Sequence, residues 1–265
     1  MRRKQVPLLL LIILLLGLLW GCGAKDSAAL PQLVIGYDNY RPYAYTDADG
    51  EPAGVDVALA KEACRRMGYE PVFQHIDWAN RDKALESGTI DCLWSCFSME
   101  TDNENYAWVG PYMYSRQVVA VPDSSELTSL SDLAGKDVAV RLTSKTESIL
   151  LDRTDSRIPE LGHVYSLRSA DEVINALRSG YVDACAGYAS VVQEMLGNAG
   201  FSYHFLSEDL MRAQLGIAFR KDSSAALREN LADVLTQMHQ DGATALILEQ
   251  YGLDSSRALE GSSVE

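Results

Sequence analysis

The residue types that most often carry enzyme chemistry are few and poorly spaced in this sequence. Its four histidines lack the spacing typical of metal ligands, and no nucleophile–base motif is present. These histidines lie at positions 75, 163, 204 and 239. We therefore expect no metal, no cofactor and no catalytic residue, and a protein that binds its ligand without converting it.

Cys22 lies in a motif with a specific covalent chemistry. It ends the tetrapeptide Leu19-Trp-Gly-Cys, which resembles a bacterial lipobox, where the cysteine is lipidated and then becomes the first residue after cleavage. Basic residues 2–4 and an uncharged stretch of 15 residues, Val6 to Trp20, precede it. A spanning helix needs about 20 residues. We therefore predict a signal peptide over 1–21 and a lipid-anchored tether over 22–32; the alternative is an uncleaved signal anchor with an incidental cysteine.

The charge balance limits the classes of partner that this protein can bind. Among 265 residues, 37 are acidic and 23 are Lys or Arg, which gives a net charge of −14. Such a chain lacks the basic surface that displaces counterions from phosphates, so we expect no nucleic-acid partner. The hydrophobic fraction of 47% is typical of a folded globular protein.

Four further cysteines are present, at positions 64, 92, 96 and 185. After export they would lie in an oxidising compartment, which permits disulfides. They allow three complete pairings, and sequence alone does not choose among them. All four fall in apolar segments, so buried free thiols are the other interpretation.

Short apolar strands alternate with amphipathic helices along the chain. The expected strands lie at 32–36, 71–76, 90–97, 116–121, 138–141, 182–186 and 215–219. The expected helices lie at 56–67, capped by Asp56, at 81–87, after Ser144, and at 171–179, 224–240 and 243–251. This alternation predicts an α/β protein with largely parallel sheets.

Four stretches follow one another in a fixed order: residues 49–60, Trp78 with residues 84–91, Trp108-Val-Gly-Pro-Tyr with the strand from 117, and residues 130–140. Together they resemble the extracellular solute-binding proteins of amino-acid-type ABC importers, the bacterial family 3. The first stretch resembles that family's G-F-D-x-x-L-A pattern, and the second resembles its W…A-L-x-S-G-x-D pattern. The resemblance covers about residues 33–252.

The resemblance implies a two-lobed periplasmic-binding-protein-like fold with two hinge strands, near Val119–Pro122 and Ala213–Ile217. Lobe one would comprise 33–120 and 216–254, lobe two 121–215, and 255–265 would be a disordered tail. Such proteins close on a small ligand by hinge bending, and the closed state is read by an ABC permease. We expect a monomer outside the cytoplasm, tethered to the membrane by its lipid, that binds an amino acid or a related small amine.

The same resemblance implies which residues line the cleft. From lobe one they are Asp38, Tyr40, Tyr43, Trp78, Ser95, Cys96, Phe97 and Ser98. From lobe two they are Thr143, Ser144, Lys145 and Thr146, at a strand-to-helix turn whose N–H groups can receive an anion. Two of them have structural alternatives, because Tyr43 could pack the turn and Trp78 could fill the core of its lobe.

Two positions depart from the family pattern. The arginine that clamps a ligand carboxylate is replaced by Asp102, or by Asn103 on another count, and the aspartate that takes the ammonium is replaced by Tyr188. A carboxylate in the cleft would favour a cationic or aromatic ligand held partly by cation–π contact with Tyr40, Tyr43, Phe97 and Tyr188. Alternatively Asp102 faces solvent, and the clamp is replaced by Arg41, Arg141 or Lys145.

Two other function classes stay open from sequence. A sensory module would bind a ligand and signal to a membrane receptor instead of feeding a permease. An enzyme of the same fold, such as a dehydratase, is the less favoured alternative, because no catalytic motif is present.

Overall fold

The computed structural model describes residues 29–100, 103–153 and 155–260. Contacts divide the chain into two units, residues 1–30 and 31–265, and the fold below is that of the second unit. The predicted signal peptide, the lipobox with Cys22 and most of the tether lie outside the described residues, as does Asp102. None of the helices described is long and apolar enough to cross a membrane.

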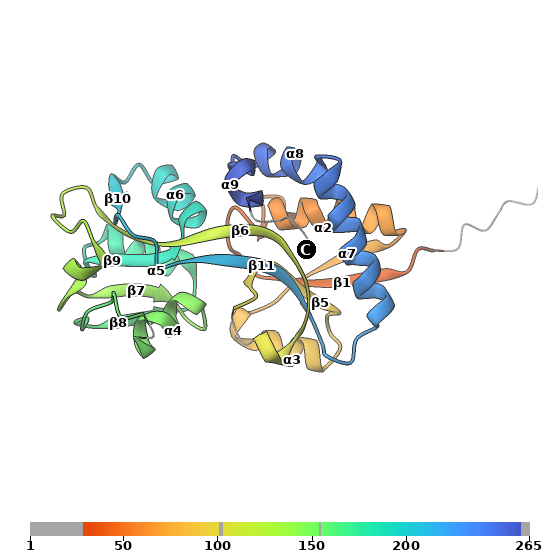
Figure 1. Cartoon of the computed structure of the whole chain (residues 1–265), viewed down its shortest axis with the longest axis horizontal. Coiled ribbons are helices and arrows are strands. Elements are labelled where there is room, and N and C mark those ends of the chain that lie inside the picture. Colours follow the sequence, from red (N-terminus) through yellow and green to blue (C-terminus); the bar gives the residue numbers. More distant parts are fainter. Residues whose placement is uncertain (1–28, 101–102, 154, 261–265) are drawn as a thin grey trace, which may run out of the picture. The chain divides into compact units, whose positions relative to one another are not determined.

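A single nine-stranded sheet runs through the described residues, in the order β4-β1-β5-β11-β6-β9-β7-β8, with β10 paired to β6 (Figure 1). Its strands are β1 (Gln32–Tyr37), β4 (Glu70–His75), β5 (Cys92–Ser98), β6 (Ala107–Pro122), β7 (Val138–Arg141), β8 (Val164–Leu167), β9 (Ala184–Tyr188), β10 (Tyr203–Phe205) and β11 (Met211–Phe219). The two ends of the sheet are parallel, whereas β6 and β11 pair antiparallel with each other and with their neighbours.

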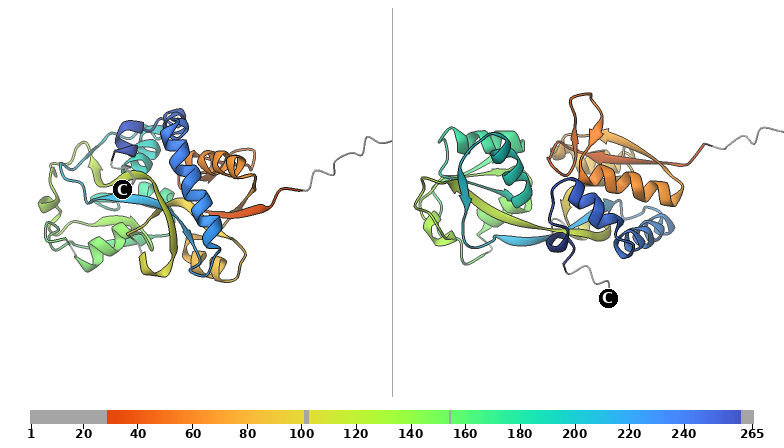
Figure 2. Two further views of the ribbon diagram at one scale, coloured as in Figure 1. Left: turned by 45° about the vertical axis from the view of Figure 1, so that its right-hand side comes forward. Right: turned by 90° about the horizontal axis from the view of Figure 1, so that it is seen from above.

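Helices cover the two ends of the sheet separately and so form two lobes (Figure 2). The helices of lobe one are α2 (Val55–Met67), α3 (Arg81–Glu86), α7 (Ala225–Gln240) and α8 (Ala243–Gln250). Those of lobe two are α4 (Lys145–Asp152), α5 (Ala170–Arg178) and α6 (Ala189–Asn198). The long strand β6 and strand β11 run from one lobe into the other, as expected for an α/β protein with two hinge strands.

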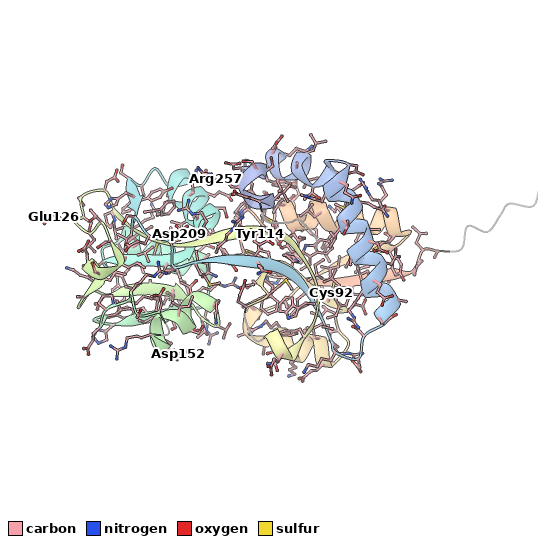
Figure 3. The ribbon with its side chains drawn as sticks, viewed as in Figure 1. Cys92, Tyr114, Glu126, Asp152, Asp209 and Arg257 are labelled. Carbon is pink, nitrogen blue, oxygen red and sulfur yellow. The ribbon has the colours of Figure 1, made fainter. Side chains whose placement is uncertain are left out.

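Strand pairing locates the crossing of β6 earlier than the sequence suggested. Residues 117–120 of β6 pair with β9 and therefore belong to the sheet of lobe two. The segment just before them pairs with β11. There Arg116 donates two hydrogen bonds of 2.7 and 2.6 Å to Asp209, which Figure 3 shows beside the crossing strands.

The start of α2 corrects the predicted helix cap. The helix begins at Val55, with Gly54 as its cap, so Asp56 lies inside the first turn and its side chain is buried. The Asp56 carboxyl accepts hydrogen bonds from the Cys96 backbone N–H (2.7 Å) and the Tyr112 hydroxyl (2.9 Å). A carboxyl that is fully occupied by contacts in the core is not available to cap the helix.

The two faces of β5 pack into different cores, as the side-chain alternation of a buried strand requires. Cys92, Trp94 and Cys96 contact the main core of lobe one, whereas Leu93 and Phe97 contact a second core on the opposite side of the sheet. The cysteines at 64, 92, 96 and 185 are buried free thiols. A short hairpin joins β2 (Tyr45–Thr46) to β3 (Pro52–Ala53).

Among the described residues, sequence patterns missed the strands β8 and β10 and the α-helices α6 and α9 (Ser255–Leu259). Helix α9 replaces the first part of the tail that we expected to be disordered. It forms because the Asp254 side chain caps it, accepting from the Arg257 N–H at 3.2 Å, and because its Ala258 is buried in the core of lobe one.

Candidate functional site

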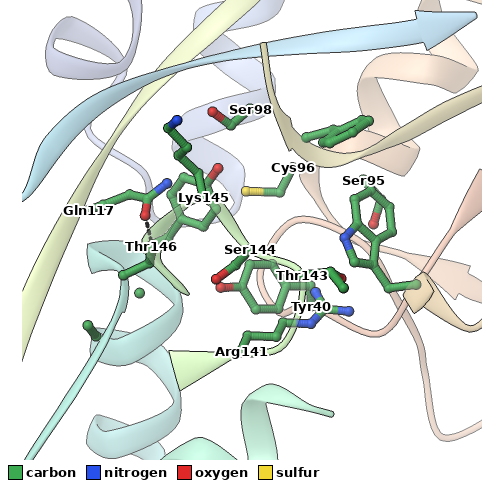
Figure 4. Close-up of a pocket in the computed structure, with 15 residues that line it drawn as sticks. Tyr40, Ser95, Cys96, Ser98, Gln117, Arg141, Thr143, Ser144, Lys145 and Thr146 are labelled. Carbon is green, nitrogen blue, oxygen red and sulfur yellow. Dashed lines mark hydrogen bonds between the residues drawn. The ribbon is translucent and has the colours of Figure 1, made fainter. Parts of the chain in front are cut away.

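A cavity of about 30 Å³ lies between the two lobes, beside the crossing strands (Figure 4). Both lobes supply its walls. The lining residues are Tyr40, Trp78, Ser95, Cys96, Phe97, Ser98, Gln117, Arg141, Thr143, Ser144, Lys145, Thr146, Ala186, Gly187 and Tyr188. Its volume is far below the ~300 Å³ of a small-molecule pocket, so the lobes must separate before a ligand can enter.

The end of β5 forms the lobe-one wall. Cys96 has a φ of 50°, which is the left-handed region that residues other than glycine seldom adopt. The buried Asp56 carboxyl supports this conformation by accepting the Cys96 N–H. Burial raises the pKa of Asp56 to about 7, and the hydrogen bonds from Tyr112 and Cys96 offset only part of that rise. The shape of this wall therefore rests on a carboxyl that titrates near neutral pH.

The two serines in this wall are already hydrogen-bonded within lobe one. The Ser95 hydroxyl accepts from the Asp38 N–H (3.2 Å) and so fixes the turn after β1 against β5. The Ser98 hydroxyl donates to Glu100 at 2.6 Å. The Ser95 hydroxyl thus positions backbone and the Ser98 hydroxyl positions the Glu100 side chain, in addition to lining the cavity.

Three tyrosines join the two lobes. The rings of Tyr40 and Tyr43 follow β1, the ring of Tyr188 ends β9, and all three ring centroids lie 6.0–6.5 Å from one another. Burial is the main cause that raises the pKa of Tyr43 and of Tyr188 well above the usual value. These rings therefore stay neutral and offer apolar faces and hydroxyl groups.

Trp78 lies both in the core of its lobe and in the lining of the cavity. It begins a short 3-10 helix, Trp78–Asn80, whose start is capped by the Asp77 side chain (3.1 Å to the Ala79 N–H). Its ring packs edge-on against Phe97 with centroids 5.0 Å apart and belongs to the second core of lobe one. The same ring also lines the cavity.

The first turn of α4 forms the lobe-two wall. The Ser144 hydroxyl caps this helix by accepting from the Glu147 N–H at 3.1 Å, while the Glu147 carboxylate accepts from the Thr143 N–H at 2.6 Å. The Thr146 hydroxyl donates to Gln117 on β6, the bond that Figure 4 marks. A helix N-terminus of this kind favours an anion.

Arg141, at the end of β7, is the most enclosed charge in the cavity. Its side chain is 9% exposed and forms an ion pair across the lobes with Asp38, whose side chain is 16% exposed. The guanidinium carbon lies 4.7 Å from the Tyr40 ring centroid and 5.7 Å from that of Trp78. The Arg141 Nε atom is buried and has no hydrogen-bond partner among the described residues.

A second arginine, Arg81, was missed by the sequence reasoning. It begins α3, is buried, and donates to the Trp78 carbonyl oxygen and to the Thr143 hydroxyl of the other lobe, both at 3.2 Å. Its guanidinium carbon lies 5.4 Å from the Trp78 ring centroid. No pattern in the sequence signalled this role, because an arginine at the start of a helix is usually exposed.

The structure brings most of the predicted site residues together. Those that line the cavity are Tyr40, Trp78, Ser95, Cys96, Phe97, Ser98, Thr143, Ser144, Lys145, Thr146 and Tyr188. Asp38 and Tyr43, which were also predicted, are not among the lining residues described. Asp38 forms an ion pair with Arg141, and Tyr43 lines a separate cavity of about 560 Å³ on the α9 side of the crossing strands. Gln117, Ala186 and Gly187 also line the cavity without having been predicted, and Arg141, one of three possible substitutes for the missing clamp, lines it too.

Comparison with known proteins agrees with this architecture. The model of the bacterial extracellular solute-binding proteins, family 3, matches residues 33–254. The chain is 26% identical to the arginine-binding extracellular protein ArtP of Bacillus subtilis, over 90% of this chain and 94% of that protein. It is also 26% identical to the histidine-binding periplasmic protein of Salmonella typhimurium, over 84% and 89%.

Solved structures show the same fold. The crystal structure of Tv2483 bound to L-arginine superposes with a TM-score of 0.75 at 26% identity, covering 83% of this chain and 90% of that one. These relatives are binding proteins and not enzymes. The two lobes, the cavity between them and the match over most of the chain show that this protein belongs to the bacterial extracellular solute-binding proteins, family 3.

Proposed function

We propose that this chain captures an amino acid or a related small amine between its lobes and delivers it to an ABC permease, while a lipid on Cys22 tethers it outside the cytoplasmic membrane. The observation that carries the proposal is the cavity lined by both lobes at the crossing strands. A ligand that contacts both lobes binds their closed arrangement more tightly than the open one and so shifts the equilibrium toward closure.

The lining suggests how an amino acid would be held. Arg141 and Lys145 are the two charged side chains among the lining residues described, and both are cationic. Together with the N-terminus of α4 they favour placing the ligand carboxylate against lobe two. Tyr40, Trp78 and Phe97 would then enclose the apolar part of the ligand from lobe one.

Contacts that already cross between the lobes support a hinge-closing motion. The Arg81 guanidinium reaches the Thr143 hydroxyl, and the Tyr43 hydroxyl reaches the Ser190 hydroxyl at 2.8 Å. Such bonds stabilise the closed state only modestly, about 1 kcal/mol each, so the lobes can still separate to admit a ligand. The arginine- and histidine-binding relatives support an amino acid as the ligand class.

Thermal unfolding of the chain from Gly23 onward, with each of the common amino acids and a set of small amines, tests the proposal. A ligand at 100 times its Kd should raise the free energy of unfolding by about 2.7 kcal/mol. Lys145→Ala should weaken that stabilisation, whereas Lys136→Ala, which removes a lysine outside the cavity, should leave it unchanged. The proposal fails if no compound in the panel raises the unfolding temperature of the wild-type chain.

A further inference from the structure

The surroundings of Arg141 form a complete receptor for a cation. Asp38 supplies a carboxylate, and the rings of Tyr40 and Trp78 supply two aromatic faces at 4.7 and 5.7 Å from the guanidinium carbon. A carboxylate next to aromatic faces is the combination that binds guanidinium and ammonium groups of ligands. Figure 4 shows the guanidinium of Arg141 beside the ring of Tyr40.

In this protein the cation comes from the chain itself. Asp38 and Tyr40 belong to lobe one, Trp78 to the same lobe, and Arg141 reaches them from the end of β7 in lobe two. A ligand with a cationic side chain would have to displace the Arg141 guanidinium from a charge-assisted pair that is largely shielded from water. It would also bring a second positive charge close to Arg141 and Lys145, which is unfavourable.

We propose that Arg141 is a specificity-determining residue: it occupies the cation subsite formed by Asp38, Tyr40 and Trp78, so the cleft selects amino acids with a neutral or acidic side chain and rejects arginine and lysine. This inference rests on the proposed function. It departs from the arginine-binding relatives, because here the guanidinium is part of the protein.

A second observation indicates which chemical group the ligand must supply. The Arg141 Nε atom is buried and lacks a hydrogen-bond partner among the residues described. A buried unsatisfied donor costs free energy, and a ligand oxygen can remove that cost. Among the described lining residues none is an aspartate or a glutamate, so a carboxylate of the ligand meets donors and no acid in this part of the lining. The oxygen of an acidic or amide side chain of the ligand would likewise contact donors and no described acid.

The first experiment compares ligands on the wild-type chain from Gly23 onward, by isothermal titration calorimetry. We expect binding of at least one of aspartate, glutamate, asparagine and glutamine, or of a small neutral amino acid, and at least tenfold weaker binding of arginine and lysine, a difference of about 1.4 kcal/mol. Tighter binding of arginine or lysine would overturn the inference and leave the proposed function intact. Binding of no amino acid at all would overturn the inference, and the proposed function would fall with it only if no small amine bound either.

The second experiment empties the subsite. Arg141→Ala should gain at least tenfold in affinity for arginine, and millimolar methylguanidinium should raise its unfolding temperature but not that of the wild-type chain. Adding Asp38→Asn to Arg141→Ala should abolish both effects, because the carboxylate partner is then missing. Lys145→Ala, which removes the other cation among the described lining residues, should not gain arginine binding.

Absence of both the arginine gain and the methylguanidinium rescue in a folded Arg141→Ala chain would show that Arg141 does not fill a cation subsite. Folding of each variant is checked by circular dichroism. If Arg141→Ala does not fold, Arg141→Gln is used in its place, and the ligand preference of the wild-type chain still decides whether the inference stands.

Discussion

The hydroxyl of Tyr43 lies 2.8 Å from the Oγ of Ser190, although 147 positions separate the two residues in the chain. The same hydroxyl lies 2.8 Å from the Oγ of Ser115 on β6. One neutral phenol therefore connects the turn after β1, a crossing strand and the first turn of α6. Because it can donate to one serine and accept from the other, it links the two lobes at their hinge side.

Tyr43→Phe should loosen the closed arrangement, since it keeps the ring and removes both hydrogen bonds. We expect the free energy of unfolding to fall by about 1 kcal/mol and the radius of gyration of the ligand-free chain to increase. Small-angle X-ray scattering and urea unfolding measure these two effects. Tyr45→Phe is the matched control, because Tyr45 contacts Arg41 through its ring face. An unchanged radius of gyration in Tyr43→Phe would show that this contact does not hold the lobes together.

Asp56 should make stability depend on pH between about 4 and 7. Its pKa is raised from 3.8 to about 7 in the folded protein, mainly by burial, so the folded state holds a proton that the unfolded chain releases. The contribution of this group to the free energy of unfolding is therefore complete below about pH 4 and is lost as the pH rises toward 7.

Asp56→Asn, which cannot ionise, should accordingly be more stable relative to the wild-type chain at pH 7 than at pH 4. Urea unfolding of both chains at several pH values measures the difference. Asp49→Asn, at an exposed position in a turn, serves as control. A stability difference between Asp56→Asn and wild type that does not grow from pH 4 to pH 7 would contradict the assignment.

The four buried cysteines should react slowly with thiol reagents. Burial raises the pKa of the Cys96 thiol and of the Cys92 thiol well above the usual value, so neither is a reactive thiolate at neutral pH. Ellman's reagent should label the folded chain from Gly23 onward only slowly, and should titrate all four thiols once it is unfolded without reductant. Fewer titrated thiols would indicate a disulfide, and rapid labelling of the folded chain would indicate an exposed thiol.

Gly54→Ala should disturb the entrance to α2 more than an ordinary glycine replacement. Gly54 has a φ of 115°, and a Cβ there would lie 2.3 Å from the Tyr43 carbonyl oxygen. We expect a loss of more than about 2 kcal/mol in unfolding free energy, from the strained backbone and the clash together. Gly50→Ala is the matched control, because its φ of 87° is also left-handed but nothing lies within 4 Å of an added Cβ. Equal losses at both positions would show that the close approach is unimportant.

Cys22→Ala tests the anchor. In a bacterial host, metabolic labelling with a clickable fatty acid should mark the wild-type chain, and the variant should be unlabelled and released from the membrane fraction. Equal membrane association of both chains would instead support an uncleaved signal anchor.

Local sequence patterns predict most elements of both lobes and the faces of β5. The alternation of Cys92, Trp94 and Cys96 with Leu93 and Phe97 predicts a strand buried on both sides, and each set lies in its own core. Such patterns work because side chains alternate across a strand whatever the rest of the chain does. The ordered motifs also predicted which elements meet at the cleft, so most lining residues were anticipated.

Elements without a strong local signal were missed. Helix α6 follows β9 directly, and its cap residue Tyr188 makes no side-chain capping bond, so no start signal precedes it. Strand β10 has three residues and helix α9 has five, which is too short for a periodic pattern. Strand β10 is stabilised by pairing with β6, and helix α9 is stabilised by burial against lobe one.

The α/β class follows from the periodicity of the chain, and the two lobes and the place of the cleft follow from the resemblance of its ordered motifs to the family. The charge pattern inside the cleft, in contrast, follows only from how the two lobes are arranged in space. Arg141 and Asp38 are 103 positions apart, and Arg81 reaches Thr143 across the lobes. Neither pairing has a local signal, because each depends on the arrangement of the two lobes and on where long, flexible side chains come to rest between them.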